Sequence, residues 1–146
     1  MEIRAMTIND YERVYALWLK TPNTGLNNLD DSKEGIAKYL ERNPNTCFVA
    51  EAEGKIIGVI LSGHDGRRGY IHHMSVDGRE QRRGVGTALV NTAMSALKCE
   101  GINKVALVVF RNNEKGNAFW EKQGFDARDD LNYRNKAVTE LTRIDT

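Results

Sequence analysis

The residues best suited to bind a ligand lie between Met74 and Leu89, where glycines and arginines occur together. In this stretch an apolar run that ends at Val76 leads into the hexapeptide Gln81–Gly86, and a helical pattern follows. The first turn of a helix carries backbone N–H groups without partners and a partial positive charge. Glycines let an anion approach those groups and arginines add counter-charge, so this spacing predicts a phosphate-binding turn.

Two common nucleotide-binding motifs do not fit this turn. A P-loop ends in Gly-Lys-Ser/Thr, which is absent here. A dinucleotide fingerprint needs a third glycine where Leu89 stands, and an acidic residue at the end of the next strand, where the sequence is Val109-Phe110-Arg111. Both motifs are therefore disfavoured, and a nucleotide-binding protein ranks third among the hypotheses for this chain.

Histidines of the apolar run before the turn are candidates for proton transfer. The period-2 geometry of a strand puts Tyr70, His72 and Met74 on one face, and the intervening residues on the other. An unperturbed histidine pKa of about 6.5 suits a general base. His72 is therefore the candidate base, or else a half-exposed sheet histidine, while His73 is interpreted as a structural or surface residue.

Hydrophobic periodicity predicts the elements that must position these residues. Glu53-Gly54 is a hairpin signal that joins two strands of an antiparallel meander. Because strands outnumber helices and are mostly sequential, the predicted fold class is α+β with a mixed sheet. Helices are expected to begin after Thr7, near Ser32, at the glycine-rich turn and at Asn112 or Asn113, and strands to cover 2–7, 46–53, 55–62, 70–76, 105–110 and 133–141.

Composition restricts the class of protein further. The chain has 146 residues, with 21 Lys and Arg against 20 Asp and Glu, which gives a net charge of +1. This length predicts one domain over 1–146, and the near-neutral charge argues against nucleic acid as a partner. The apolar runs are too short to cross a bilayer. Cys47 and Cys99 fit neither a metal site nor a disulfide scaffold, and no export signal is evident, so we expect a cytoplasmic protein.

The hexapeptide Gln81–Gly86 resembles Q/R-x-x-G-x-G/A, the acetyl-CoA signature of the GCN5-related N-acetyltransferase (GNAT) superfamily. Two further segments are similar to the family in the same order. They are the apolar run Ile71–Val76 and the segment Asn113–Phe125, which resembles N-x-x-A-x-x-x-Y-E-K-x-G-F. Gly63–Gly69 also resembles a connection found in a bacterial subgroup. The resemblance covers about residues 1–128 and does not extend into the tail.

The resemblance implies the GNAT fold, a mixed and mostly antiparallel sheet of six to seven strands with about four flanking helices. In that fold the strands matching 70–76 and 104–110 splay apart, and acetyl-CoA lies in the gap as co-substrate. No metal is expected. The residues that match the family's cofactor-binding positions are Met74 and Val76 on the strand, Arg82, Arg83, Gly84, Val85, Gly86 and Thr87 in the turn, and Asn113 and Trp120 after the next strand.

The resemblance also implies an N-acetyltransferase that moves the acetyl group of acetyl-CoA to a primary amine by direct nucleophilic attack. The expected acceptor is a small molecule, a peptide or a protein. Neither nucleic acid nor a membrane is expected as a partner, and the chain is expected to be a monomer or a homodimer. Some members carry a base at the positions of Tyr70 and His72. Many have a tyrosine acid at the position of Trp120, whose indole does not ionise usefully. Tyr133 is the substitute candidate, or otherwise a packing residue.

The alternative hypothesis is a non-catalytic module that holds an acyl-CoA as a sensor or regulatory partner. The absence of the family's tyrosine at Trp120 is its main support. Asp30, Asp31 and Glu34 lie near the segment that lines the acceptor side in the family. They either attract a cationic amine or act as helix-cap and solvated acids.

Overall fold

The computed structural model describes residues 1–145 and contains five strands and four α-helices in that part of the chain. Two short 3-10 turns, Ile8–Asp10 and Gly78–Glu80, precede α1 and α3. Among the described residues, no helix has the length and apolar character needed to span a membrane. The elements are β1 (Glu2–Ala5), α1 (Tyr11–Lys20), α2 (Lys33–Arg42), β2 (Phe48–Ala52), β3 (Lys55–His64), β4 (Gly69–Val76), α3 (Val85–Cys99), β5 (Val105–Leu107) and α4 (Glu114–Lys122).

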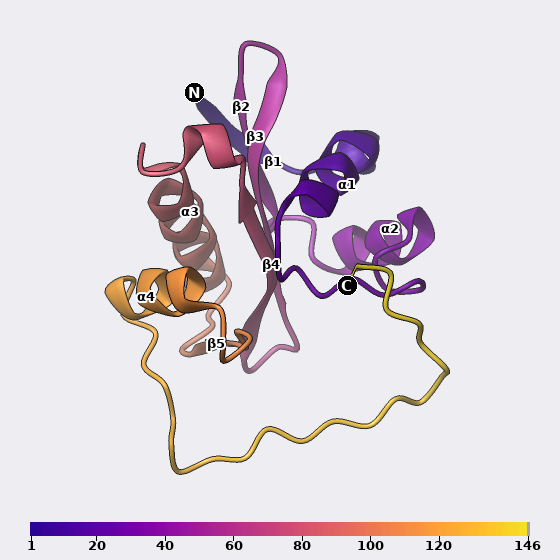
Figure 1. Cartoon of the computed structure of the whole chain (residues 1–146), viewed down its shortest axis with the longest axis vertical. Helices are drawn as coiled ribbons and strands as arrows, with labels where there is room; N and C mark the ends of the chain where they lie inside the picture. The colour runs from indigo at the N-terminus through magenta and orange to yellow at the C-terminus, as the bar shows by residue number, and fades with distance from the viewer. Residues whose placement is uncertain (146) are drawn as a thin grey trace.

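The sheet follows the order of the sequence, β1-β2-β3-β4-β5, and lies between two layers of helices (Figure 1). The first three pairings are antiparallel and the β4–β5 pairing is parallel, which confirms a mixed sheet in an α+β fold. Helices α1 and α2 cover one face and α3 and α4 the other, each over its own buried apolar cluster. A parallel pair needs a crossover connection, and α3 supplies it.

Local sequence signals account for the ends of several elements. The Thr7 backbone N–H donates to the Asp10 carboxylate at 2.9 Å at the start of the segment that becomes α1. Ser32 caps α2 by accepting the Gly35 N–H at 3.0 Å. Both residues of the Glu53–Gly54 hairpin turn have positive φ, 51° and 76°, as a tight primed turn requires. These predicted starts and this predicted turn are confirmed.

The tail forms no strand within the described residues, so the predicted sheet of six to seven strands is wrong and the sheet has five. Residues 126–141, which we call the arch, run as an extended loop that stands away from the body of the molecule (Figure 1). The strand predicted over 133–141 therefore lacks a neighbour in its own chain.

The end of the tail is held by the loop between α1 and α2. The Asn28 N–H donates to the Thr142 carbonyl at 2.9 Å. The Asp145 carboxylate accepts the N–H groups of Gly25 and Leu26 at 2.8 and 2.6 Å. We call this contact the clasp. It holds the end of the tail at the loop before α2, and residues 133–141 pair with none of the five strands.

Candidate active site

The gap beside β4 opens because β4 and β5 pair over only three residues. Gly69–Ile71 pair with Val105–Leu107, and no pairing follows. Beyond Ile71 the backbone of β4 has β3 on one side and no strand on the other. The strand predicted over 105–110 is therefore paired only as far as Leu107. Beyond this residue β4 and β5 separate, as predicted.

A cleft of about 1780 Å³ runs from the turn before α3 to the loop between α1 and α2. This volume exceeds that of a site for one small ligand, so the cleft has room for a long cofactor and a second substrate. Arg83 does not line it, and its guanidinium lies 3.3 Å from the carboxylate of Glu80. The other predicted site residues all line it: Tyr70, His72, Met74, Val76, Arg82, Gly84, Val85, Gly86, Thr87, Asn113, Trp120 and Tyr133.

Left-handed backbone conformations shape the turn before α3. Arg82 has φ of 68° and Gly84 has φ of 81°. Gly84 is the residue before the first turn of α3, and no side chain caps the helix there. A Cβ added at Gly84 would meet no atom within 4 Å, so glycine is needed for backbone conformation and not for space. The first N–H groups of α3 thus keep their capacity to bind an anion.

Gly86 has a different structural reason from Gly84. A Cβ at Gly86 would lie 3.2 Å from the Phe119 ring and 3.6 Å from the Val76 side chain. Its missing side chain therefore lets α4 pack closely against α3. Gly86 thus has a packing role beside the expected role of letting an anion approach the turn.

A β-bulge in β4 changes the faces predicted for its side chains. His72 has no opposite residue on β3, because the residues before and after it pair with the adjacent Ser62 and Leu61. The alternation therefore shifts by one residue. His73 lies with His72 on the side of α1 and α2, and Met74 packs into the cluster beneath α3. The prediction that Met74 shares a face with His72 is wrong for this reason.

His72 is exposed in the cleft beside two tyrosines. Its ring centroid lies 4.6 Å from that of Tyr70 and 5.3 Å from that of Tyr39, which meets it edge-on. Partial desolvation between the cleft walls, and secondly the nearby His73, lower the pKa of His72 below its ordinary value. The sequence pattern places Tyr39 only in the apolar stripe of its helix and gives no sign of its contact with the candidate base.

His73 is a structural residue held by a buried carboxylate. Its Nε2 lies 2.7 Å from Asp31 Oδ1, and its ring packs edge-on against Trp18 at 5.0 Å. Asp31 is only 4% exposed, and its second oxygen accepts the Asn27 N–H at 2.8 Å. The expectation of a helix-capping or solvated acid is therefore wrong for Asp31, because Ser32 caps α2 and the Asp31 carboxylate binds His73 of β4 to the loop before α2.

Tyr133 reaches the cleft from the arch and is 62% exposed. Burial and, as a smaller cause, the neighbouring hydroxyl of Tyr133 raise the pKa of Tyr70 above its ordinary value. The structure thus brings the three predicted catalytic candidates, Tyr70, His72 and Tyr133, to the same part of the cleft.

Asn113 and Trp120 line the cleft from the side of α4. The Asn113 Oδ1 caps α4 by accepting the Gly116 N–H at 3.0 Å, so only its amide N–H groups are free to meet a ligand. Trp120 packs edge-on against Phe119 at 5.0 Å and Phe125 at 5.2 Å. Its position favours packing against a bound molecule over proton transfer.

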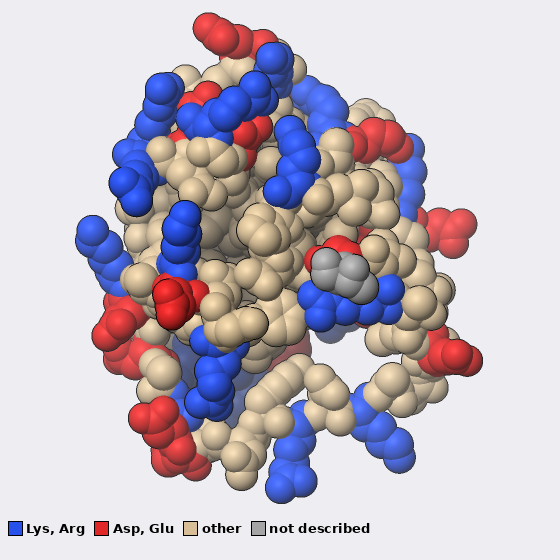
Figure 2. Space-filling model, in the orientation of Figure 1, with Lys and Arg blue, Asp and Glu red and all other residues tan. Residues whose placement is uncertain are grey.

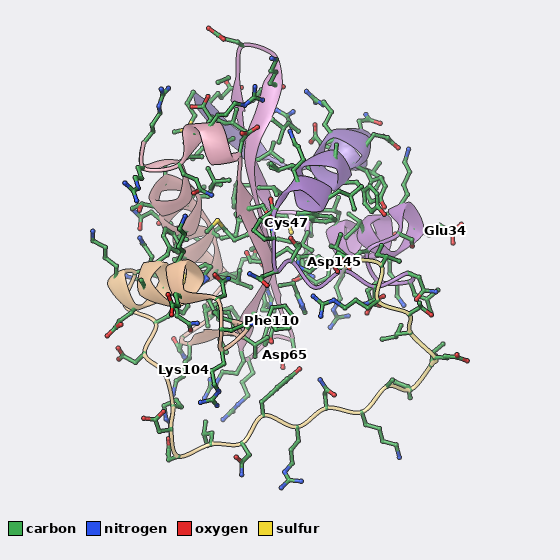
Figure 3. All side chains as sticks on the ribbon, viewed as in Figure 1. Glu34, Cys47, Asp65, Lys104, Phe110 and Asp145 are labelled. Carbon is green, nitrogen blue, oxygen red and sulfur yellow. The ribbon has the colours of Figure 1, made fainter. Side chains whose placement is uncertain are left out.

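The tail also contacts a wall of the cleft, and sequence patterns do not reveal this contact. The Arg143 guanidinium lies over the Phe110 ring at 4.9 Å from its centroid, and Phe110 lines the cleft close to Gly25. Figure 3 shows Phe110 just beyond β5 and Asp145 beside the loop before α2. Asp145 and its partner Gly25 are 120 positions apart, so no local pattern in the sequence marks this contact.

Known proteins resemble this chain over most of its length. Residues 11–125 match the family described as Acetyltransferase (GNAT) family. An acetyltransferase of Sodalis glossinidius is 29% identical over 140 residues, which are 96% of this chain and 97% of that protein. An acetyltransferase of Photorhabdus laumondii is 31% identical over 130 residues, 88% of each chain.

A solved structure shows the same fold. The PaiA N-acetyltransferase from Thermoplasma acidophilum, in complex with coenzyme A, superposes with a TM-score of 0.77 at 21% identity, over 88% of this chain and 91% of that one. This likeness shows a shared fold, and the sequence match over residues 11–125 shows the family. The chain belongs to the GNAT family of acetyltransferases, and its acetyl donor is acetyl-CoA.

Proposed function

We propose that this chain is an N-acetyltransferase that transfers the acetyl group of acetyl-CoA to a primary amine of a small molecule, a peptide or a protein. The observation that carries the proposal is the position of His72, a histidine of lowered pKa exposed in the cleft that also contains the uncapped start of α3. An anion site and a candidate base in one cleft suit a phosphorylated donor and an amine that must lose a proton.

The turn Arg82–Thr87 is proposed to hold the pyrophosphate of coenzyme A. Its fit rests on the left-handed Gly84, the uncapped N–H groups of α3 and the exposed Arg82, which lines the cleft, while Arg83 would contribute its backbone. The β4 backbone at Met74 and Val76, beside the splay, is proposed to pair with the pantetheine amides. The Asn113 amide and the Trp120 ring complete the donor site from α4.

Acetyl-CoA supplies an acyl group activated as a thioester, with a thiolate as leaving group. His72 accepts the proton of the attacking amine, directly or through water, and its lowered pKa keeps the imidazole neutral at neutral pH. A backbone N–H near Met74 or Ser75 stabilises the negative charge that develops on the carbonyl oxygen. The hydroxyl of Tyr133, close to that of Tyr70, is proposed to donate a proton to the thiolate.

A non-catalytic acyl-CoA sensor is the second candidate. It is favoured by Trp120, which stands where many members of the family have an ionisable tyrosine and which packs against Phe119 and Phe125. A thiolate is a good leaving group that can depart without an acid, so the tryptophan by itself does not exclude turnover.

A thiol-release assay separates the two candidates. The purified chain is mixed with acetyl-CoA and a panel of primary amines that includes alkylamines, amino sugars and peptides with free N-termini or lysines. The proposal expects amine-dependent release of coenzyme A and an acetylated amine in the mass spectrum. If calorimetry shows tight binding of coenzyme A while no amine of any class releases thiol, the chain is a sensor.

A further inference from the structure

The face of α2 that lies in the cleft is cationic. Lys38 and Arg42 both line the cleft, and helix residues four positions apart lie on one face. Tyr39, which precedes Arg42 by three positions, meets the candidate base His72 edge-on, with 5.3 Å between the ring centroids. The two cations therefore lie on the wall of the cleft beside the candidate base. We call this wall, formed by α2 and the loop before it, the acceptor side.

Neither cation is neutralised by the part of the chain that the structure describes. Within residues 1–145, the exposed side chains of Lys38 and Arg42 form no ion pair. Lys33 of the same helix does not line the cleft, and its Nζ lies 2.9 Å from a Glu12 carboxylate oxygen. Like charges four residues apart destabilise a helix, so an anion bound between Lys38 and Arg42 would stabilise α2.

The acids nearest to this face are engaged elsewhere or point away. The Asp31 carboxylate is 4% exposed and lies 2.7 Å from His73 Nε2. Glu34 does not line the cleft, and Figure 3 shows it pointing outward from α2. Asp30 lines the cleft with its Oδ2 accepting the Asn27 side-chain N–H at 3.0 Å. Among the described residues, the acceptor side thus has two unpaired cations and one exposed carboxylate.

The tail does not cover the cationic face. Figure 2 shows an opening between the arch and the rest of the molecule. Of residues 126–145, only Tyr133 lines the cleft. A second substrate can therefore reach Lys38 and Arg42 without displacing the tail.

We propose that the acetyl acceptor is a primary amine that carries an anionic group of its own, a carboxylate or a phosphate, as in an amino acid or an aminoalkyl phosphate. Lys38 and Arg42 bind the anion by charge-assisted hydrogen bonds, and Asp30 attracts the ammonium group before it loses its proton to His72. The inference rests on the proposed acetyl transfer and adds the class of acceptor. Amines with several positive charges are poor acceptors, because both cations repel them.

Matched pairs of amines test the class of acceptor in the thiol-release assay. β-Alanine is compared with its amide, phosphoethanolamine with ethanolamine, and both acids with an amino sugar that has several ammonium groups. At least one acid is expected to have a kcat/KM about tenfold or more above that of its uncharged partner, and the larger ratio identifies the anion as carboxylate or phosphate. Equal kcat/KM within both pairs, or faster transfer to the amino sugar, overturns the proposal.

Lys38→Ala and Arg42→Ala test where the anion binds. Each is expected to lower the ratio of acid to uncharged amine about tenfold, through a higher KM for the acid. Lys33→Ala is the matched control on the same helix, because Lys33 lies outside the cleft, and it keeps the wild-type ratio. All three side chains are exposed, so the variants are expected to fold, as circular dichroism checks. A preference for acids that survives in both cleft variants overturns the assignment to α2.

Calorimetry separates this inference from the proposed acetyl transfer. The chain is saturated with coenzyme A and titrated with β-alanine or phosphoethanolamine, so binding is measured without turnover. Binding of either acid that Lys38→Ala weakens supports the anion site, even when no amine releases thiol and acetyl transfer alone fails. The absence of binding heat with both acids overturns the anion site, whether or not uncharged amines release thiol.

Discussion

His72 and His73 are adjacent in sequence and have opposite environments. The bulge turns both toward α1 and α2, but Asp31 binds only His73, and the ring of His73 is packed against Trp18. His72 has no carboxylate partner among the described residues, and it faces the cleft beside Tyr70. One histidine therefore fixes the strand, and the other is free to exchange a proton.

His72→Ala is expected to lower kcat at pH 7 by roughly 100-fold, the lower end of the range for loss of a general base. A base acts in its neutral form, and partial desolvation lowers the pKa of His72 below its ordinary value of 6.5, so protonation of His72 reduces the wild-type kcat only at a pH below that value. The loss in the variant shrinks at high pH, where the amine deprotonates without help. A pH–rate profile of thiol release measures both effects.

The control for this substitution is His64→Ala. His64 lies outside the cleft with its Nε2 2.7 Å from a Glu100 carboxylate oxygen, so its loss leaves the pH–rate profile unchanged. A His72→Ala enzyme with wild-type kcat at neutral pH removes His72 from the mechanism.

Gly84→Glu is expected to abolish binding of coenzyme A. The substitution adds a negative charge at the uncapped start of α3 and strains a residue with φ of 81°. Gly54→Glu is the matched control, because Gly54 has φ of 76° and equally open surroundings but lies in the β2–β3 hairpin. Both variants lose about 1 kcal/mol of stability. In calorimetry only Gly84→Glu loses binding, and normal affinity in that variant shows that the phosphate site lies elsewhere.

At the scale of elements, local sequence patterns predicted helix caps and the hairpin turn, but they did not predict the bulge in β4. Caps at Ser32 and Asn113 and the hairpin turn at Glu53–Gly54 are encoded by neighbours in sequence, and the structure confirms them. The bulge at His72 adds no composition signal, because a bulged strand has the same apolar content as a regular one. Its effect on Met74 was therefore not predictable from alternation.

The stability of the clasp at the loop before α2 depends on pH through the Asp145 carboxylate. Burial acts to raise the pKa of Asp145, but the N–H groups of Gly25 and Leu26 outweigh it and lower the pKa below 3.8. A lowered pKa means that the clasp is fully stabilising above the unfolded value and is lost as pH falls through the folded one. We expect the clasp to be intact at neutral pH and to open in strong acid.

Asp145→Asn tests the clasp at neutral pH. An amide accepts hydrogen bonds less strongly than a carboxylate, so the variant loses about 1–2 kcal/mol of local stability. Hydrogen-exchange protection of the Gly25 and Leu26 amides is expected to fall by roughly tenfold. Asp130→Asn, which breaks only the exposed pair with Arg128, leaves that protection unchanged. Equal protection in the Asp145→Asn variant and the wild type contradicts the role of the carboxylate.

For the whole molecule, the sequence was sufficient for the α+β class, the four helices and the position of the turn before α3, because each depends on local periodicity. It was not sufficient for the number of strands. The alternating pattern over 133–141 indicates a preference for pairing with another strand, but it does not show whether a sheet edge lies within reach of that segment. The clasp, which holds the end of the tail, joins residues 119 and 120 positions apart, so local patterns do not encode the path of the tail.

Ligand-dependent stability tests the donor site in the intact chain. A ligand that binds only the folded state stabilises it by about 2.7 kcal/mol at a concentration one hundred times its Kd. For a chain of this size, that raises Tm by on the order of 5–10 °C. Acetyl-CoA and coenzyme A are expected to raise Tm in a calorimetric scan, and ATP and NAD at equal concentration to raise it far less, since the turn lacks the P-loop lysine and the third glycine of a dinucleotide site. A larger shift with either nucleotide assigns the anion site to nucleotides and removes the basis for acetyl transfer at His72.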